Sequence, residues 1–164
     1  MDDANLPSLL AMPYYGYANA TDEIYLRTRK AVLSDANPWW SNVSQTTVCC
    51  LDINCFLTTQ LALPRQGTAA SGIGGPHVGL GHIWPMALTA RGWTAVTDSE
   101  VSSMLETLVN SSACSGLIHE SFSQDDFTDF TRPWFAWANS YFADFVLKVI
   151  DERPHLVLSP PGSD

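Results

Sequence analysis

Residues 116–142, GLIHESFSQDDFTDFTRPWFAWANSYF, join a polar loop directly to an aromatic helix. In the second half of this segment, aromatic residues recur at the i, i+3 and i+4 spacing of a helix face. The carboxylates and the arginine of the first half can bind sugar hydroxyls, and aromatic rings stack on the C–H face of a pyranose. The same residues also fit loop capping and an ordinary buried helix, so composition alone leaves a sugar site and a plain core equally open. The polar members are His119, Glu120, Asp125, Asp126, Asp129 and Arg132, and the aromatic members are Trp134, Phe135, Trp137, Tyr141 and Phe142.

The composition indicates one globular unit. The chain has 164 residues, of which 46% are hydrophobic and 11% aromatic, and this is enough to bury one core. Its net charge of −9 argues against nucleic acid and anionic membranes as partners, because both reward lysine and arginine. No apolar run is long enough to cross a bilayer, so no membrane span is predicted.

The sequence leaves the cellular location open. The first residues, MDDANLPS, lack the basic region and the apolar core of a signal peptide. The sequons at Asn19 and Asn110 are compatible with the secretory pathway or an extracellular location, although such triplets often occur by chance. We therefore assign no compartment from the sequence.

Helical spacing and capping signals predict an all-α chain. Thr21 or Asp22 is a suitable N-cap, residues 97–100 form a capping-box pattern, and Pro154 should end the last helix. No segment shows the alternation of a strand, so we expect helical hairpins joined by loops that carry the site. The expected helices cover about residues 6–12, 23–33, 83–93, 97–109 and 131–153.

Three strings in this sequence resemble a known family of glycosidases. They are DDANLPSLLAMPY at residues 2–14, SGIGGPHVGLGHIWPMAL at residues 71–88, and HESF followed by FTRPWFAWANS within residues 119–140. In this order they resemble glycoside hydrolase family 125, the exo-acting α-1,6-mannosidases, known in fungi also as the meiotically up-regulated protein family. The resemblance covers nearly the whole chain except residues 43–66 and the last few residues, but only the C-terminal part of the family.

The resemblance implies a fold and a domain organisation. The family forms an (α/α)6 toroid, the six-hairpin glycosidase fold, in which paired helices ring a central pocket. This chain offers too few helices for a complete toroid, so we expect residues 1–158 to form its C-terminal portion, with the N-terminal part outside this sequence. The tail at residues 159–164 is expected to be disordered.

The resemblance also implies which residues act. Family members are inverting enzymes, which use two carboxyl groups and no covalent intermediate, and no metal or other cofactor is expected. Glu120 matches the general base. The general acid of the family lies in an upstream arginine-proline-serine-aspartate-aspartate string that this sequence lacks. The expected substrate-binding residues are Asp2, Asp3, His77, Trp84, His119, Arg132 and Trp134.

Plainer interpretations stay open at several of these positions. Asp2 and Asp3 fit helix capping as well as the rim of a pocket, because carboxylates are stabilised at a helix start. His77 and His82 fit two independent loop histidines as well as two ligands of a metal ion. Neither aspartate replaces the missing general acid, since both belong to a different and later motif of the family.

Two functions follow from the resemblance. The first is hydrolysis of terminal mannose from α-mannosides or N-glycan-type oligosaccharides, with this truncated chain inactive by itself because the general acid is missing. The second is a noncatalytic fragment or pseudoenzyme that binds mannosides weakly. A metal-dependent hydrolase built on His77, His82, His119 and Glu120 is a weaker third hypothesis. The sequence says nothing of the oligomeric state.

Residues 43–66, VSQTTVCCLDINCFLTTQLALPRQ, interrupt the resemblance and show no clear helical or strand period. Cys49, Cys50 and Cys55 lack a CxxC pair, which argues against zinc, and their odd number argues against a simple disulfide hairpin. We interpret the segment as a retained intron translated in frame, because its codons can hold splice signals and its removal joins two matching strings. A mature transcript that keeps these codons contradicts this hypothesis.

Overall fold

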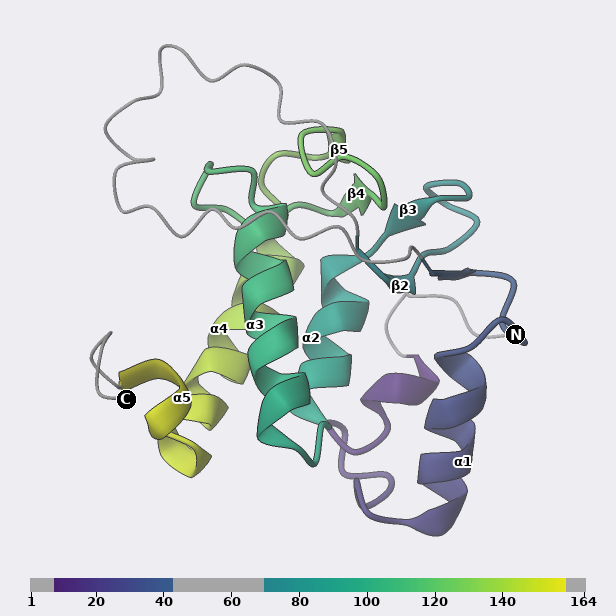
Figure 1. Ribbon diagram of the computed structural model, residues 1–164, viewed down its shortest axis with the longest axis vertical. Coiled ribbons are helices and arrows are strands. Elements are labelled where there is room, and N and C mark those ends of the chain that lie inside the picture. Colours follow the sequence, from purple (N-terminus) through teal and green to yellow (C-terminus); the bar gives the residue numbers. More distant parts are fainter. Residues whose placement is uncertain (1–7, 43–69, 159–164) are drawn as a thin grey trace.

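The computed structural model describes residues 8–42 and 70–158 (Figure 1). The predictions for Asp2, Asp3, residues 43–66 and residues 159–164 lie outside the described residues. In chain order the elements are the 3-10 helix η1 (Leu9–Ala11), α1 (Glu23–Val32), β1 (Trp40–Ser41), β2 (Gly72–Ile73), β3 (His82–Ile83), α2 (Pro85–Trp93), α3 (Asp98–Ser111), β4 (Ser121–Ser123), β5 (Phe130–Thr131), α4 (Ala136–Glu152) and α5 (His155–Leu158).

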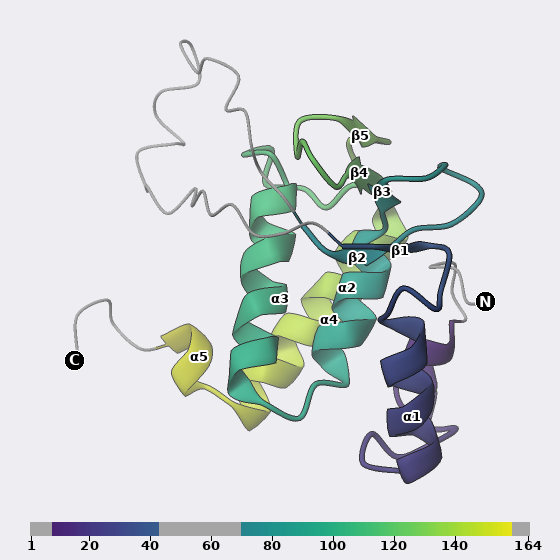
Figure 2. The ribbon, with the colours of Figure 1, turned by 45° about the vertical axis from the view of Figure 1, so that its right-hand side comes forward.

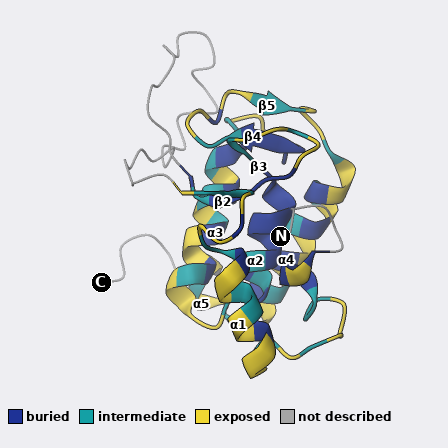
Figure 3. Ribbon diagram, turned by 90° about the vertical axis from the view of Figure 1, so that its right-hand side faces the viewer, coloured by how far each residue is buried: buried dark blue, intermediate teal, exposed yellow. Residues whose placement is uncertain are grey.

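Three helices form the centre of the structure. α2 packs against both α3 and α4, and Figures 1 and 2 show the three side by side, with β3, β4 and β5 at one end. The turn η1 packs against both α1 and α2, which joins α1 to the central helices. One cluster of buried residues includes Trp84 and Tyr141, and a second includes Leu88 and Phe145 (Figure 3). The helices thus provide a packed base for the loops and strands at their end.

The predicted helix starts are confirmed where a side-chain cap was expected. Asp22 caps α1, because its Oδ1 accepts hydrogen bonds from the backbone of Ile24 at 2.8 Å and of Tyr25 at 3.2 Å. The Thr97 hydroxyl caps α3 by accepting from the backbone of Glu100 at 3.3 Å. The helix expected at about residues 6–12 is present only as the short turn η1 within the described residues.

The expectation of an all-α chain is wrong in one respect, because five short strands accompany the helices within residues 8–42 and 70–158. β1 pairs with β2, and β3, β4 and β5 form an antiparallel sheet in that order. Strands of two or three residues are too short to show a period of two in the sequence. Ile83, expected as the first residue of a helix, lies in β3, and α2 begins at Pro85.

The last long helix also begins later than expected. Thr131 was predicted to open it, but Thr131 lies in β5 opposite Ser121, and α4 begins at Ala136. Arg132 has a φ of 44°, which a right-handed helix cannot continue, and Pro133 disfavours helical geometry in the residue before it. The end of α4 agrees with the prediction, because Arg153 is its C-cap directly before Pro154.

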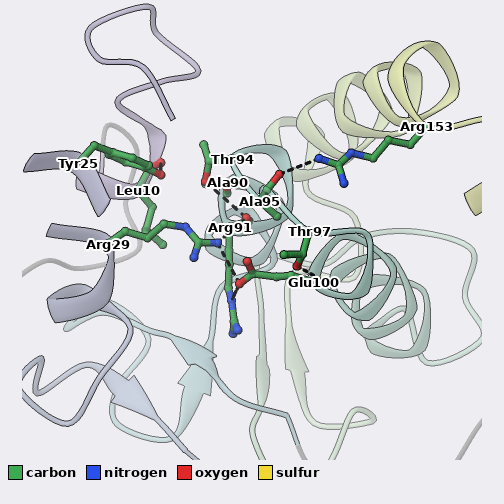
Figure 4. A network of polar contacts seen from close by, with 10 residues as sticks. All are labelled: Leu10, Tyr25, Arg29, Ala90, Arg91, Thr94, Ala95, Thr97, Glu100 and Arg153. Atoms are coloured by element: carbon green, nitrogen blue, oxygen red, sulfur yellow. Dashed lines mark hydrogen bonds and ion pairs between the residues drawn. The ribbon is translucent and has the colours of Figure 1, made fainter. Parts of the chain in front are cut away.

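A network of charged groups fastens α1 to α2 and α3 (Figure 4). Oε1 of Glu100 lies 2.8 Å from Nε of Arg91 and 3.0 Å from Nη2 of Arg29. Beside it, the Tyr25 hydroxyl donates to the carbonyl oxygen of Leu10 at 2.9 Å. One carboxylate on α3 therefore holds two guanidinium groups, one on each neighbouring helix.

We expect Glu100→Gln to lower the free energy of unfolding by about 1–2 kcal/mol at pH 7, because two partly buried guanidinium groups lose their carboxylate. Burial alone would raise the pKa of Glu100, but hydrogen bonds from Arg91 and Arg29 outweigh burial and hold the pKa below its usual value. A lowered pKa stabilises the fold above the unfolded pKa, and this contribution is lost as the pH falls through the folded pKa.

Urea unfolding of the wild type and of Glu100→Gln at pH 7 and at about pH 3 checks this expectation, since an unfolded glutamate has a pKa of about 4.3. The difference in free energy of unfolding between the two proteins should be present at pH 7 and should shrink at the lower pH. Glu23→Gln is the matched control, because Glu23 also pairs with an arginine, Arg27, at 2.7 Å but is exposed. An equal loss for the two variants at pH 7 contradicts the account.

Candidate functional site

Strand pairing brings Glu120 and Arg132 together. Glu120 directly precedes β4 and Arg132 directly follows β5, and Ser121 lies opposite Thr131 in the ladder between these strands. The backbone N–H of Glu120 donates to the carbonyl oxygen of Thr131 at 3.2 Å. Residues twelve positions apart in the sequence therefore share one end of the sheet.

The carboxylate of Glu120 is buried and has three polar neighbours. Glu120 is only 4% exposed. Its Oε2 accepts a hydrogen bond from the Thr131 hydroxyl at 3.0 Å and lies 3.3 Å from Nε of Arg132. Its Oε1 lies 3.7 Å from Nε2 of His77. These neighbours offset the cost of burying a carboxylate, while the Arg132 and His77 side chains are themselves exposed at the rim.

A group of aromatic rings lies beside this carboxylate. The His77 and Trp84 rings lie 6.2 Å apart in an edge-on arrangement, and the Trp84 and Phe135 rings lie 6.3 Å apart at 88°. The guanidinium carbon of Arg132 lies 5.8 Å from the centre of the Phe135 ring. Trp84 is buried, and its indole N–H has no hydrogen-bond partner within the described residues. The site thus combines one buried carboxylate, the Arg132 guanidinium and the His77 imidazole beside it, and aromatic rings.

His119 is directed away from the surface. It is completely buried, and its ring stacks on Phe130 with the ring centres 3.7 Å apart. Its Nδ1 lies 2.7 Å from the carbonyl oxygen of Pro133, and its Nε2 lies 3.2 Å from that of Ser112. His119 therefore lies between the carbonyl groups of Ser112 and Pro133, and its buried ring is not open to solvent.

The other predicted residues are placed differently. Trp134 is 63% exposed, and Trp137, one turn further on, is 70% exposed, so both offer open aromatic surface next to the site. Asp126 accepts hydrogen bonds from the backbone and the hydroxyl of Thr128, at 2.8 and 2.7 Å, and so caps its own turn. The structure brings Glu120, His77, Trp84 and Arg132 together and leaves Trp134 at the edge.

Sequence reasoning missed the hydroxyl groups beside the carboxylate. Thr131 and Ser121 lie next to Arg132 and Glu120 in the sequence, so their positions were available as a signal. Their contact depends on the pairing of β4 with β5, and strands this short could not be recognised. His82, which lies 3.3 Å from the Ser121 hydroxyl, was considered as a loop histidine or a metal ligand, and not as a partner of Ser121.

Within residues 8–42 and 70–158, no group of three or more histidine, cysteine, aspartate or glutamate side chains is arranged to hold a metal ion. In the same described residues, every helix is too short or too polar to cross a membrane.

Comparison with known families identifies the chain. A family model described as "Metal-independent alpha-mannosidase (GH125)" matches residues 1–49 and 58–147. The matched model describes a family of glycoside hydrolases. The chain belongs to glycoside hydrolase family 125, which confirms the family expected from the three strings.

Two relatives support the assignment. The chain is 41% identical over 158 residues to the meiotically up-regulated gene 157 protein of Schizosaccharomyces pombe, covering 96% of this chain and 26% of that protein. The structure also matches a metal-independent α-mannosidase of Streptococcus pneumoniae, solved in a non-productive complex with α-1,6-mannobiose. That match has a TM-score of 0.74 and 38% identity, and it covers 93% of this chain and 30% of that one. The chain therefore spans about a quarter to a third of these relatives.

Proposed function

We propose that this chain provides the base-bearing part of the active site of an inverting exo-α-1,6-mannosidase. The observation that carries the proposal is the buried carboxylate of Glu120, which has Arg132, Thr131 and His77 around it and aromatic rings beside it. The substrate is the non-reducing end of an α-mannoside or of an N-glycan-type oligosaccharide. Family membership supports the glycosidase class, and the α-1,6-mannobiose complex of the bacterial relative supports the linkage.

The chemistry needs two carboxyl groups. Glu120, as the base, takes a proton from a water molecule whose oxygen attacks the anomeric carbon. A carboxylic acid on the other side of the bond protonates the glycosidic oxygen as the C–O bond breaks, so mannose leaves with inverted configuration. An inverting pair stands roughly 6.5–9.5 Å apart, which leaves room for the water. The aspartate string of the family is not present in this sequence, so we place the general acid outside residues 1–164.

The side chains around Glu120 have separate roles in this proposal. Arg132 orients the carboxylate through Oε2, and His77 reaches the other oxygen from the rim. Trp134 is open to solvent and offers ring surface on which the C–H face of mannose can stack, while the buried Trp84 ring packs behind His77. Asp2 and Asp3 remain candidates for binding sugar hydroxyls at the rim.

The helices are proposed to form part of an (α/α)6 toroid. Several apolar side chains on helix faces are exposed in this chain, among them Ile24 on α1 and Leu147 on α4, at 73% and 64%. Apolar helix faces of this kind are buried when a further helix packs on them. Neighbouring helices of the same toroid would cover them.

The test is hydrolysis of mannobioses by the longest in-frame protein that the gene encodes, here called the full reading-frame protein. We expect turnover of the α-1,6 linkage, less turnover of the α-1,2 and α-1,3 linkages, and no loss of activity in excess chelator. Residues 1–164 alone should bind mannosides weakly and give no turnover, because they lack the acid. A full reading-frame protein that binds mannosides without hydrolysing any of them contradicts the proposal and identifies a noncatalytic binding protein.

A further inference from the structure

Three polar side chains connect Glu120 to the opposite edge of the small sheet. The Thr131 hydroxyl donates to Oε2 of Glu120 at 3.0 Å. Oγ1 of Thr131 lies 2.7 Å from Oγ of Ser121, which lies 3.3 Å from Nδ1 of His82. Each of these three residues belongs to a different strand of the β3–β4–β5 sheet. The contacts therefore form one continuous chain across the sheet.

Counting hydrogens fixes the direction of this chain. An ionised carboxylate only accepts hydrogen bonds, and each hydroxyl has one hydrogen to donate. Thr131 gives its hydrogen to Glu120, so at the next contact Ser121 must donate to Thr131. Ser121 has then used its own hydrogen, so Nδ1 of His82 must carry a proton and donate to Ser121. Every bond points toward the carboxylate, an arrangement in which successive hydrogen bonds polarise and strengthen one another.

This chain of hydrogen bonds distinguishes the two oxygens of Glu120. Oε2 receives the Thr131 hydroxyl and has the Arg132 guanidinium 3.3 Å away. Oε1 lies 3.7 Å from the exposed His77 ring, which is beyond an ordinary hydrogen bond. Because Oε2 is already engaged, Oε1 is the oxygen with a lone pair left to take a proton from water.

The residues joined by these hydrogen bonds differ in how far they are buried. Ser121 is fully buried and Glu120 is 4% exposed. His82, at the far end, is half-buried and lines a cavity of about 230 Å³ that it shares with Trp39, Trp40 and Gln124. Of the three residues, His82 borders this cavity, Ser121 is buried within the sheet, and Thr131 is half-buried beside Glu120.

We propose that His82, Ser121 and Thr131 are positioning residues for the hydrolytic reaction. Together they fix Oε2 of Glu120 and so aim Oε1 at the attacking water. This inference rests on the proposed function of Glu120 as the general base. None of the three residues needs to touch the sugar, so their effect should fall on the chemical step and not on the binding of substrate.

Thr131→Val, which removes the hydroxyl at nearly constant size, should lower kcat on α-1,6-mannobiose by about 10- to 100-fold with little change in KM. Thr131→Ser keeps a hydroxyl and should stay within about 3-fold of the wild type in kcat. Thr128→Val is the matched control, because it also removes a threonine hydroxyl. That hydroxyl donates to Asp126 in the turn between β4 and β5 and is not one of the hydrogen bonds that lead to Glu120. Its kcat should equal that of the wild type.

Double variants test whether the residues act through one another. Ser121→Ala should lower kcat by about 3- to 10-fold in the wild-type background and have no further effect once Thr131→Val is present. His82→Leu should likewise lower kcat alone but not in the Ser121→Ala background. His82→Asn, which retains a nitrogen donor near the position of Nδ1, should restore part of the loss.

All variants are made in the full reading-frame protein, and thermal unfolding midpoints are compared so that loss of folding is recognised. If Thr131→Val does not fold, the inference is tested by comparing kcat of Ser121→Ala, His82→Leu and the double variant that combines them. Additive losses in the double variants, a change in KM with unchanged kcat, or equal losses for Thr131→Ser and Thr131→Val overturn the inference. The two proposals fail separately: turnover by Glu120→Gln refutes the base assignment, whereas an inactive Glu120→Gln beside a normal Thr131→Val refutes only the positioning chain.

Discussion

Glu120→Gln should lower kcat on α-1,6-mannobiose by about 10²- to 10⁴-fold, the range that general bases contribute, while mannoside binding stays within about 10-fold of the wild type. Glutamine has nearly the same size and can still accept from Thr131, but its amide cannot take a proton from water. The carboxylate is almost fully buried, so bulk water does not easily replace it. Steady-state kinetics and calorimetric titration with the disaccharide measure the two quantities on the full reading-frame protein.

Glu23→Gln is the matched control for this experiment as well. Glu23 pairs with Arg27 at 2.7 Å, as Glu120 pairs with Arg132, but it is exposed at the start of α1. Its removal should leave kcat and KM unchanged. Near-normal turnover by Glu120→Gln contradicts the assignment of Glu120 as the base, and a comparable loss in Glu23→Gln points to a general effect on folding.

Gly74→Ala should have the largest effect on stability, lowering the free energy of unfolding by about 3 kcal/mol or more. A Cβ at position 74 would lie 2.0 Å from the carbonyl oxygen of His82, which is a backbone atom and cannot rotate away. Either the strand that carries His82 would have to move, or residue 74 would shift and strain the 2.9 Å hydrogen bond from its backbone N–H to the carbonyl oxygen of Trp39. Thermal and urea unfolding of the full reading-frame protein measure the loss.

Gly79→Ala, in the same glycine-rich loop, separates crowding from backbone strain. A Cβ at Gly79 would meet nothing within 4 Å, but Gly79 has a φ of 90°, which alanine rarely adopts. Its cost should be about 1–2 kcal/mol. Equal stability losses at the two positions would show that crowding against β3 is not the dominant effect at Gly74.

The helices could be predicted because their signals are local. The N-cap Asp22 and the capping residue Thr97 contact backbone groups two or three positions away, so the sequence alone contains both partners. Glu100 shows the limit of this reasoning. Its place in the capping-box pattern was recognised, but its carboxylate binds Arg29 and Arg91 on two other helices, and those contacts exist only in the folded chain.

The strands and the hydroxyl groups of the site could not be predicted, because their contacts also exist only in the folded protein. β3 and β5 have two residues each, so their existence depends on partners that lie far away in the sequence. Thr131 was therefore interpreted as the start of a helix, although its hydroxyl supports Glu120. The family resemblance supplied Glu120, His77, Trp84 and Arg132 among its expected site residues, and these four lie together in the structure.

His119 shows that a sequence motif does not state which way a side chain points. It is adjacent to Glu120 in the string HESF, and adjacency suggested a second residue in the site. Successive residues at a strand end point to opposite sides, so the neighbour of a site residue often faces the core. The buried ring of His119, stacked on Phe130, follows that rule.

The most direct test of the central claim follows the first sugar released from α-1,6-mannobiose by proton NMR, using the full reading-frame protein. The account predicts that β-mannose forms first and then mutarotates to the equilibrium mixture, because Glu120 activates water and forms no bond to the sugar. Initial release of α-mannose would contradict this account, since retention requires a carboxylate that attacks the anomeric carbon as a nucleophile.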